Sequence, residues 1–248
     1  MRFVMSVLHL IWMTLTVVPY ALYLLSAALL GASSDTLYKV AKAWLTVCIS
    51  SARLMLDIQY RIQGFENLPI ESTSPAILLV KHQSTYETFL LPAIMPHPLA
   101  YVFKKELLSI PFFGWSIGRL AMIHIDRKEK AQAFNKVVTQ GKALLDQGIW
   151  VIMFPEGTRI DRGQKGIYKT GGTRLAIETG VPVIPIAITS AKCWPRKAFV
   201  KQSGIVDVSI GKPIPSLNRQ PEEFMREVET WIESEMHRLD AQAYLSSS

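Results

Sequence analysis

The sequence predicts an α/β fold in which helices flank a mostly parallel central sheet, preceded by an N-terminal helical segment that associates with a membrane. From about residue 60 onward, short apolar runs alternate with amphipathic helical patterns, which is typical of parallel sheets. From Phe3 to Ser34 the chain has no charged residue. Its 248 residues suffice for one large domain together with an anchor.

Residues 1–58 are predicted to form an apolar helical membrane anchor. As one straight helix, the charge-free run would span about 48 Å, which exceeds the ~30 Å hydrocarbon core of a bilayer. Pro19 lies near its middle, so a kinked span and a two-helix hairpin that dips into one leaflet both remain open. The apolar core of a cleaved signal peptide would be shorter, about 7–15 residues.

A second apolar-rich helix is expected at residues 36–58, and Lys39, Lys42 and Arg53 follow the charge-free run closely. Positive charges that flank membrane segments are enriched on the cytoplasmic side. We therefore expect a protein on the cytoplasmic face of a membrane, which in a bacterium would be the inner or plasma membrane. Membrane lipids are therefore expected to be partners of this protein.

The folded domain is expected to occupy residues 59–240, and residues 241–248 are expected to form a flexible tail. Short apolar runs in this domain predict strands, and amphipathic stretches predict helices. The predicted strands are 76–80, 100–103, 122–125, 149–154, 183–188 and 206–210, and the predicted helices are 85–95, 130–147, 171–179 and 222–239.

Composition narrows the class of partner. The net charge is +7, and the densest basic group lies within residues 192–201. The apolar N-terminus favours anionic lipid over nucleic acid as the partner of this group, no nucleic-acid-binding motif is present, and a solvated basic loop stays open. Cys48 and Cys193 are far apart and no metal-ligand spacing occurs, so neither a disulfide framework nor a metal site is predicted. Lys169 lacks the preceding glycine of a P-loop, so ATP binding is not predicted either.

His82 and Glu87 follow the predicted strand 76–80. On one continuous helix, side chains five positions apart would point about 140° from each other. The two meet if His82 lies in the turn after the strand and Glu87 lies in the first turn of the next helix. Glu87 would then fix the imidazole tautomer and leave the other ring nitrogen free to accept a proton. A surface histidine beside a helix-start carboxylate is the alternative.

Residues 154–159, Phe-Pro-Glu-Gly-Thr-Arg, follow the predicted strand that begins at residue 149. Arg159 is the candidate for binding a phosphate group, because a guanidinium can bind two oxygens at once. Gly157 lets the backbone approach closely, Thr158 offers a hydroxyl donor, and Glu156 either orients these groups or contacts the substrate. The alternative is a tight turn with a surface ion pair.

Four blocks in order resemble the glycerolipid acyltransferases, and most closely their 1-acylglycerol-3-phosphate (lysophosphatidate) branch. Residues 81–87 resemble the H-x-x-x-x-D box of that family, with Glu87 in the aspartate position. Glutamate keeps the charge and adds one methylene, so the bond to His82 is retained. The remaining blocks are 105–107, 110–115 and 125–127 for the second, 154–159 for the third and 181–187 for the fourth. The resemblance identifies residues 59–240 as an acyltransferase catalytic domain.

The resemblance implies transfer of a fatty acyl chain from acyl-CoA or acyl carrier protein to the sn-2 hydroxyl of lysophosphatidate, giving phosphatidate in phospholipid biosynthesis. A thioester is already activated, so no covalent enzyme intermediate is needed, and no cofactor is expected besides acyl-CoA or acyl carrier protein as co-substrate. His82 would act as general base and Glu87 would stabilise the imidazolium. By the same resemblance Lys105 belongs near the phosphate, and Arg127 is a further candidate. The aromatic run 110–115 is either core or the lining of an acyl-chain channel.

Three alternatives stay open. The first is an acyltransferase that uses another acceptor, either another lysolipid or glycerol-3-phosphate, in place of lysophosphatidate. A metal hydrolase with His82 and Glu87 as ligands would lose activity when a chelator is added. A catalytically decayed membrane-binding module would bind lipid equally well after His82→Ala.

Overall fold

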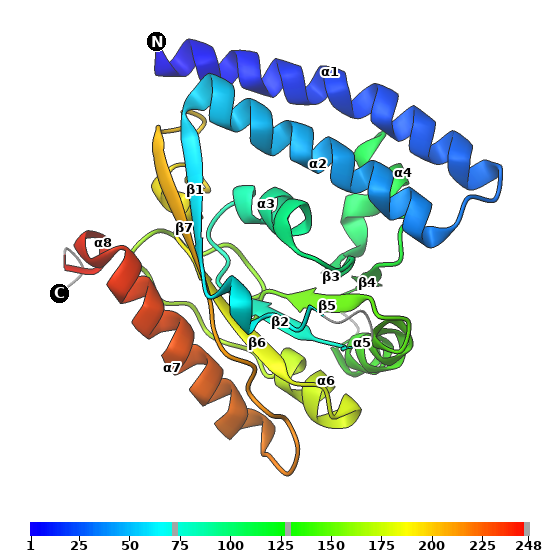
Figure 1. Ribbon diagram of the computed structural model, residues 1–248, viewed down its shortest axis with the longest axis vertical. Coiled ribbons are helices and arrows are strands. Elements are labelled where there is room, and N and C mark those ends of the chain that lie inside the picture. The colour runs from blue at the N-terminus through cyan, green and yellow to red at the C-terminus, as the bar shows by residue number, and fades with distance from the viewer. Residues whose placement is uncertain (71–73, 127–129, 246–248) are drawn as a thin grey trace.

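The computed structural model describes residues 1–70, 74–126 and 130–245, and its centre is a seven-stranded sheet (Figure 1). The strands are β1 (Ile58–Gln63), β2 (Ile77–Val80), β3 (Leu99–Lys104), β4 (Ile123–Ile125), β5 (Trp150–Met153), β6 (Val183–Ile188) and β7 (Gly204–Ile210). Their order across the sheet is β1-β7-β6-β2-β5-β3-β4. All neighbours are parallel except β6 and β7, which are antiparallel. The predicted α/β fold with a mostly parallel sheet is confirmed.

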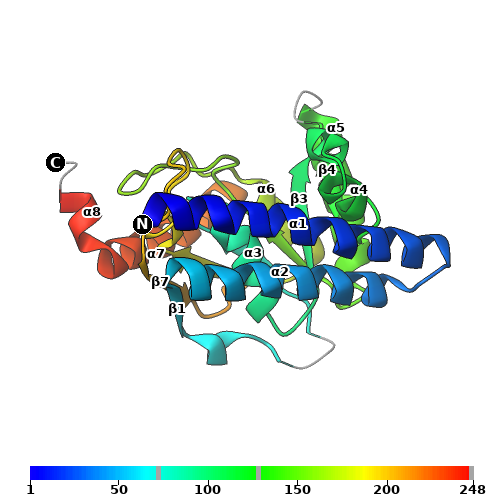
Figure 2. The ribbon, with the colours of Figure 1, turned by 90° about the horizontal axis from the view of Figure 1, so that it is seen from above.

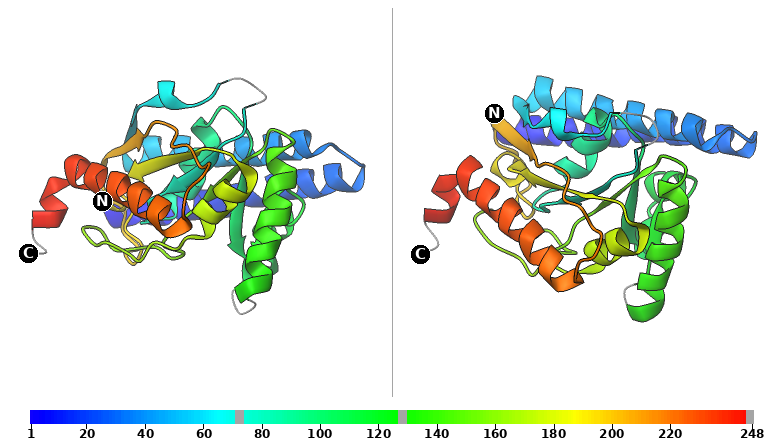
Figure 3. Two further views of the ribbon diagram at one scale, coloured as in Figure 1. Left: turned by 90° about the horizontal axis from the view of Figure 1, so that it is seen from below. Right: turned by 60° about the horizontal axis from the view of Figure 1, so that its bottom comes forward.

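Helices cover both faces of the sheet (Figures 1 and 3). One layer contains α1 (Arg2–Leu29), α2 (Ser34–Leu56) and α3 (Tyr86–Ile94), and the other contains α5 (Lys130–Leu145), α6 (Gly171–Thr179) and α7 (Pro221–Leu239). Strand β2 is apolar at every position because both of its faces are buried. Successive side chains point to opposite faces, so Leu78 joins the core under α2 and α3, while Leu79 joins the core under α5 to α7.

Helices α1 and α2 form an antiparallel pair that lies across the sheet (Figures 1 and 2). Helix α1 continues through Pro19 without a break, so the hairpin joins α1 to α2 rather than two halves of the charge-free run. Ser33 caps the N-terminus of α2, and its hydroxyl accepts the Thr36 N–H at 3.2 Å. Among the described residues, only α1 is long and apolar enough to cross a membrane. Its many exposed apolar side chains favour membrane association.

The structure differs from the sequence prediction at both ends of the domain. Strand β1 was not predicted, and it pairs in parallel with β7, in register Ile58 with Gly204. Residues 241–245, predicted as the start of a flexible tail, form helix α8 (Ala241–Leu245). That helix packs closely on the chain at Gly163, where an added Cβ would lie 2.2 Å from the Ala243 carbonyl oxygen. Residues 246–248 lie outside the described residues.

Candidate active site

His82 lies in the turn between β2 and α3, and its Nδ1 is 2.9 Å from Glu87 Oε1. This confirms the predicted hydrogen bond between the two side chains. A carboxylate only accepts, so Nδ1 carries the proton and Nε2 is the ring nitrogen left to accept another. The imidazole also stacks on Phe154, with ring centroids 3.8 Å apart. Two independent contacts therefore fix the orientation of the ring.

Glu87 holds the loop that carries His82 as well as the imidazole itself. The carboxylate is fully buried in the first turn of α3, where a negative charge is favoured. Its Oε1 accepts the N–H groups of Gln83 at 2.7 Å and Ser84 at 2.6 Å. Its Oε2 accepts the hydroxyl of Ser190. Glutamate in the aspartate position thus makes four hydrogen bonds and keeps the orienting contact.

Glu156 lies behind His82 rather than in contact with the substrate space. It is only 4 % exposed and is absent from the cavity lining described below. One oxygen pairs with Lys81 Nζ at 2.7 Å, and the other accepts the His82 N–H at 2.7 Å. Burial raises the pKa of Glu156 to about 7, although Lys81 opposes the shift. Of the two roles the sequence left open, the geometry favours orientation.

The loop after β5 and a later lysine together form a cationic cradle. Gly157 adopts a positive φ of 67°, and a Cβ there would lie 3.1 Å from Lys169 Nζ. Arg159 donates from Nη1 to Thr85 Oγ1 at 2.7 Å, which ties the cradle to the loop of the histidine. Thr158 lies between them and is exposed. Lys169 was not predicted as a site residue, because its only sequence signal was the failed P-loop comparison.

A cavity of about 890 Å³ joins the histidine to the cradle. His82, Thr158, Arg159 and Lys169 line it. The rest of its wall is mostly apolar and comes largely from α1, α2, α3 and the short helix α4 (Phe113–Ile117). Examples are Val17, Leu24, Trp44, Phe89, Ile117 and Leu120. Of the aromatic run 110–115, only Phe113 contributes to the lining.

Two predicted residues remain, Lys105 and Arg127. Lys105 is exposed and does not line the cavity, whereas its neighbour Lys104, the last residue of β3, does. Burial, with smaller contributions from Lys136 and Lys105, lowers the pKa of His124 on β4. Lys105 follows the end of β3, where Lys104 pairs with Ile125 of β4. Arg127 lies outside the described residues.

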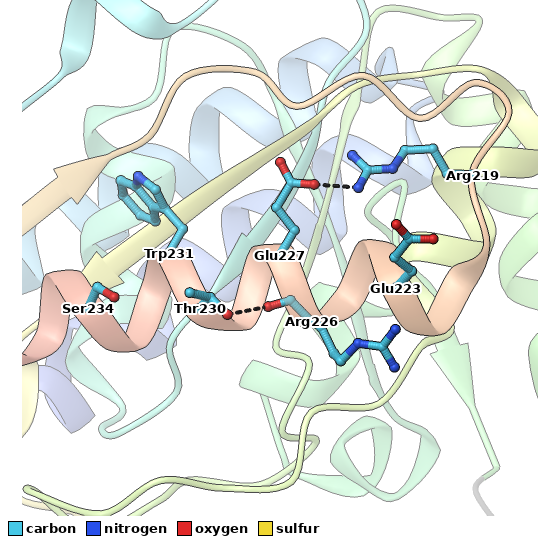
Figure 4. Close-up of a pocket in the computed structure, with 7 residues that line it drawn as sticks. All are labelled: Arg219, Glu223, Arg226, Glu227, Thr230, Trp231 and Ser234. Atoms are coloured by element: carbon cyan, nitrogen blue, oxygen red, sulfur yellow. Dashed lines mark hydrogen bonds and ion pairs between the residues drawn. The ribbon is translucent and has the colours of Figure 1, made fainter.

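A second hollow, of about 550 Å³, lies on the outer surface of α7 (Figure 4). Charged side chains dominate it, and its Arg219 is already paired with Glu227. None of the predicted site residues lines this hollow. The larger cavity is therefore the candidate active site.

An oriented histidine and a cationic cradle thus share one mostly apolar cavity. The acyltransferase family profile matches residues 59–189, which is 131 of the 248 residues. The chain belongs to the acyltransferase family.

Several relatives carry a more specific name. A 1-acyl-sn-glycerol-3-phosphate acyltransferase from Pseudomonas aeruginosa is 39 % identical over 200 residues, covering 79 % of this chain and 76 % of that protein. A 1-acyl-sn-glycerol-3-phosphate acyltransferase from Saccharomyces cerevisiae is 31 % identical over 174 residues, covering 67 % of this chain and 55 % of that protein. This chain therefore spans about half the length of the yeast relative. The crystal structure of the 1-acyl-sn-glycerophosphate acyltransferase PlsC from Thermotoga maritima shares the fold, with a TM-score of 0.80, 24 % identity and coverage of 97 % and 98 %.

Proposed function

We propose that this chain is a 1-acylglycerol-3-phosphate O-acyltransferase. It transfers a fatty acyl chain from acyl-CoA or acyl carrier protein to the sn-2 hydroxyl of lysophosphatidate, and the product is phosphatidate. The observation that carries the proposal is the placement of His82 in the same cavity as Arg159 and Lys169. A lipid that has a phosphate close to a free hydroxyl fits a base beside a pair of cations.

The chemistry follows from the hydrogen bond of the histidine. Nε2 of His82 takes the proton from the acceptor hydroxyl as its oxygen attacks the thioester carbonyl carbon. The tetrahedral intermediate collapses, the carbon–sulfur bond breaks, and the leaving thiolate takes the proton back from Nε2. Glu87 stabilises the imidazolium in between. General-base assistance of this kind typically contributes about 10²–10⁴ in rate.

The cradle supplies the acceptor specificity in this proposal. Arg159 offers a planar pair of donors to the phosphate, and Lys169 adds a second charge. Gly157 leaves the backbone open to close approach, since it has no side chain between the loop and Lys169. The apolar part of the cavity, which side chains of α1 and α2 line, accommodates an acyl chain in this proposal.

The proposed location is the cytoplasmic face of a membrane. The exposed apolar surface of α1 supports membrane association. Lys39 and Lys42 lie near the start of α2, close after that helix, and positive charges in this position favour the cytoplasmic side. Arg53 lies in the last turn of α2, at the other end of the helix.

The test is transfer of a radiolabelled acyl chain by the purified protein in mixed micelles. Wild type is expected to acylate lysophosphatidate, and His82→Ala is expected to lose about 10²–10⁴ in kcat. His237→Ala, an exposed histidine on α7, is the matched control and should keep wild-type activity. Equal turnover by His82→Ala and wild type would exclude the general-base role.

Parallel arms of the same assay separate the alternatives. Glycerol-3-phosphate and a lysolipid with an amine headgroup replace lysophosphatidate in the acceptor arms. Acyl-CoA and acyl carrier protein are compared as donors. A chelator arm addresses the metal hydrolase, since a metal-dependent enzyme would lose its activity there. A preference for an acceptor without phosphate would contradict the proposed cradle.

A further inference from the structure

Lys81, the residue before His82, is a fully buried lysine. Its Nζ lies 2.7 Å from Glu156 and 2.7 Å from Glu233, which belongs to α7. It also donates to the carbonyl oxygen of Gln164 at 3.2 Å. A buried cation requires a partner because its desolvation is costly. One carboxylate would neutralise this lysine, so the second one calls for a different explanation.

The cluster connects α7 to the backbone of the histidine through an unbroken series of contacts. Glu233 Oε1 accepts from Lys81 and also from the Tyr168 hydroxyl, at 2.7 Å in each case. Lys81 in turn contacts one oxygen of Glu156, and the other oxygen of Glu156 accepts the His82 N–H. The backbone that presents the imidazole is thus held by a carboxylate that α7 positions.

We infer that Lys81 and Glu233 are positioning residues for acyl transfer. Glu233 holds Lys81, Lys81 holds Glu156, and Glu156 holds the amide of His82. Helix α7 lies outside residues 59–189, the part of the chain that matches the family profile, yet it sets where the imidazole stands. The reaction in this inference rests on the proposed function, while the contacts do not.

The protonation of Glu156 makes the inference testable. Its carboxyl group contacts Lys81 and interacts electrostatically with Glu233, Tyr168 and, from α8, Tyr244. Burial raises its pKa, Lys81 lowers it, and the charge of Glu233 raises it further. The ionised form holds the His82 amide by a charge-assisted hydrogen bond, which is the stronger kind. Removal of the Glu233 charge therefore extends activity to lower pH, and removal of the Lys81 charge restricts it to higher pH.

The experiment compares Glu233→Gln and Lys81→Met with Glu227→Gln as the matched control. Glu227 lies on the same helix but pairs with Arg219 on the outer surface (Figure 4). The profile of kcat against pH is measured from about pH 5 to 9 with lysophosphatidate. Both test variants are expected to lose roughly tenfold or more in kcat, with KM close to wild type, because small misplacements of a base are costly.

The direction of the shifts decides the result. In Glu233→Gln the acid limb of the profile moves to lower pH, in Lys81→Met it moves to higher pH, and Glu227→Gln coincides with wild type. Profiles that coincide with wild type, or that shift in the same direction in both variants, overturn the inference. If Lys81→Met does not fold, the Glu233→Gln profile decides alone.

A second measurement keeps this inference separate from the proposed function. Hydrogen exchange of the His82 amide is compared well above the pKa of Glu156, where this carboxylate is ionised in both variants. Exchange is then expected to be faster in Glu233→Gln than in Glu227→Gln, because Lys81 and Glu156 have lost the partner on α7, and equal rates overturn the inference. If wild type does not acylate lysophosphatidate, the proposed function fails and hydrogen exchange decides the positioning role. If wild type acylates it and neither measurement changes, only the positioning role fails.

Discussion

Glu87→Gln should separate the charge of Glu87 from its hydrogen bonds. The amide oxygen of glutamine can occupy the position of Oε1 and accept from His82, Gln83 and Ser84. The amide nitrogen then faces the Ser190 hydroxyl, which can accept instead of donating. The number of hydrogen bonds is kept, so the variant should fold, with a loss of about 1 kcal/mol for each bond that is no longer charge-assisted.

The loss of the charge acts on the protonated imidazole that forms during the reaction. With the two charges centred roughly 4 Å apart at an effective dielectric constant of about 20, their attraction is about 4 kcal/mol. The lower limit of the lost stabilisation is the difference between a charged and a neutral hydrogen bond, about 1 kcal/mol. The expected fall in kcat is therefore about 5-fold to 10³-fold.

The assay is acyl transfer to lysophosphatidate, with thermal unfolding by circular dichroism as the test of folding. Glu178→Gln, an exposed carboxylate on α6, is the control and should match wild type. A folded Glu87→Gln variant with kcat within about twofold of wild type would refute the electrostatic role of Glu87.

Two further variants test the cradle and the cavity. Lys169→Ala should raise KM for lysophosphatidate by about tenfold or more, because a charge-assisted contact to the phosphate is lost. The KM for an acceptor without phosphate should not change. The control is Lys165→Ala, which removes an exposed lysine that pairs with Glu229. An equal effect on both acceptors would contradict the phosphate role. Ala41 of α2 lines the cavity, and Ala41→Phe would fill part of it. When acyl-CoA donors of different chain length compete, this variant should prefer shorter chains than wild type does. Ala43 is exposed on the same helix, so Ala43→Phe should keep the wild-type preference.

The central sheet could be predicted because its strands are buried on both faces. A run such as Ile77–Val80 is then apolar at every position, which is a strong local signal. Edge strand β1 gives a weaker signal, since Gln59 and Arg61 interrupt its apolar positions. Its partner β7 begins near Gly204, far along the chain, so no local pattern indicated the pairing.

The same distinction between local and distant contacts explains the site. His82 and Glu87 are five positions apart, so the geometry of one turn was enough to predict their bond. Lys81 and Glu233 are separated by 152 positions, and only the packing of α7 on the sheet brings them together. Lys169 reaches Gly157 in the same way, across a loop whose course the sequence does not specify.

Helix α1 contributes Val17 and Leu24 to the inside of the cavity and exposes other apolar side chains on its outer surface. Moving a sixteen-carbon chain from lipid into water costs about 12 kcal/mol, at roughly 0.8 kcal/mol for each methylene. Under the proposed function, α1 would separate the bilayer from the cavity, and the acceptor would pass between them without exposing its acyl chain to water. Turnover is then expected to depend on the mole fraction of acceptor in the lipid surface, so that dilution with inert phospholipid would slow acyl transfer even at a constant bulk concentration of acceptor.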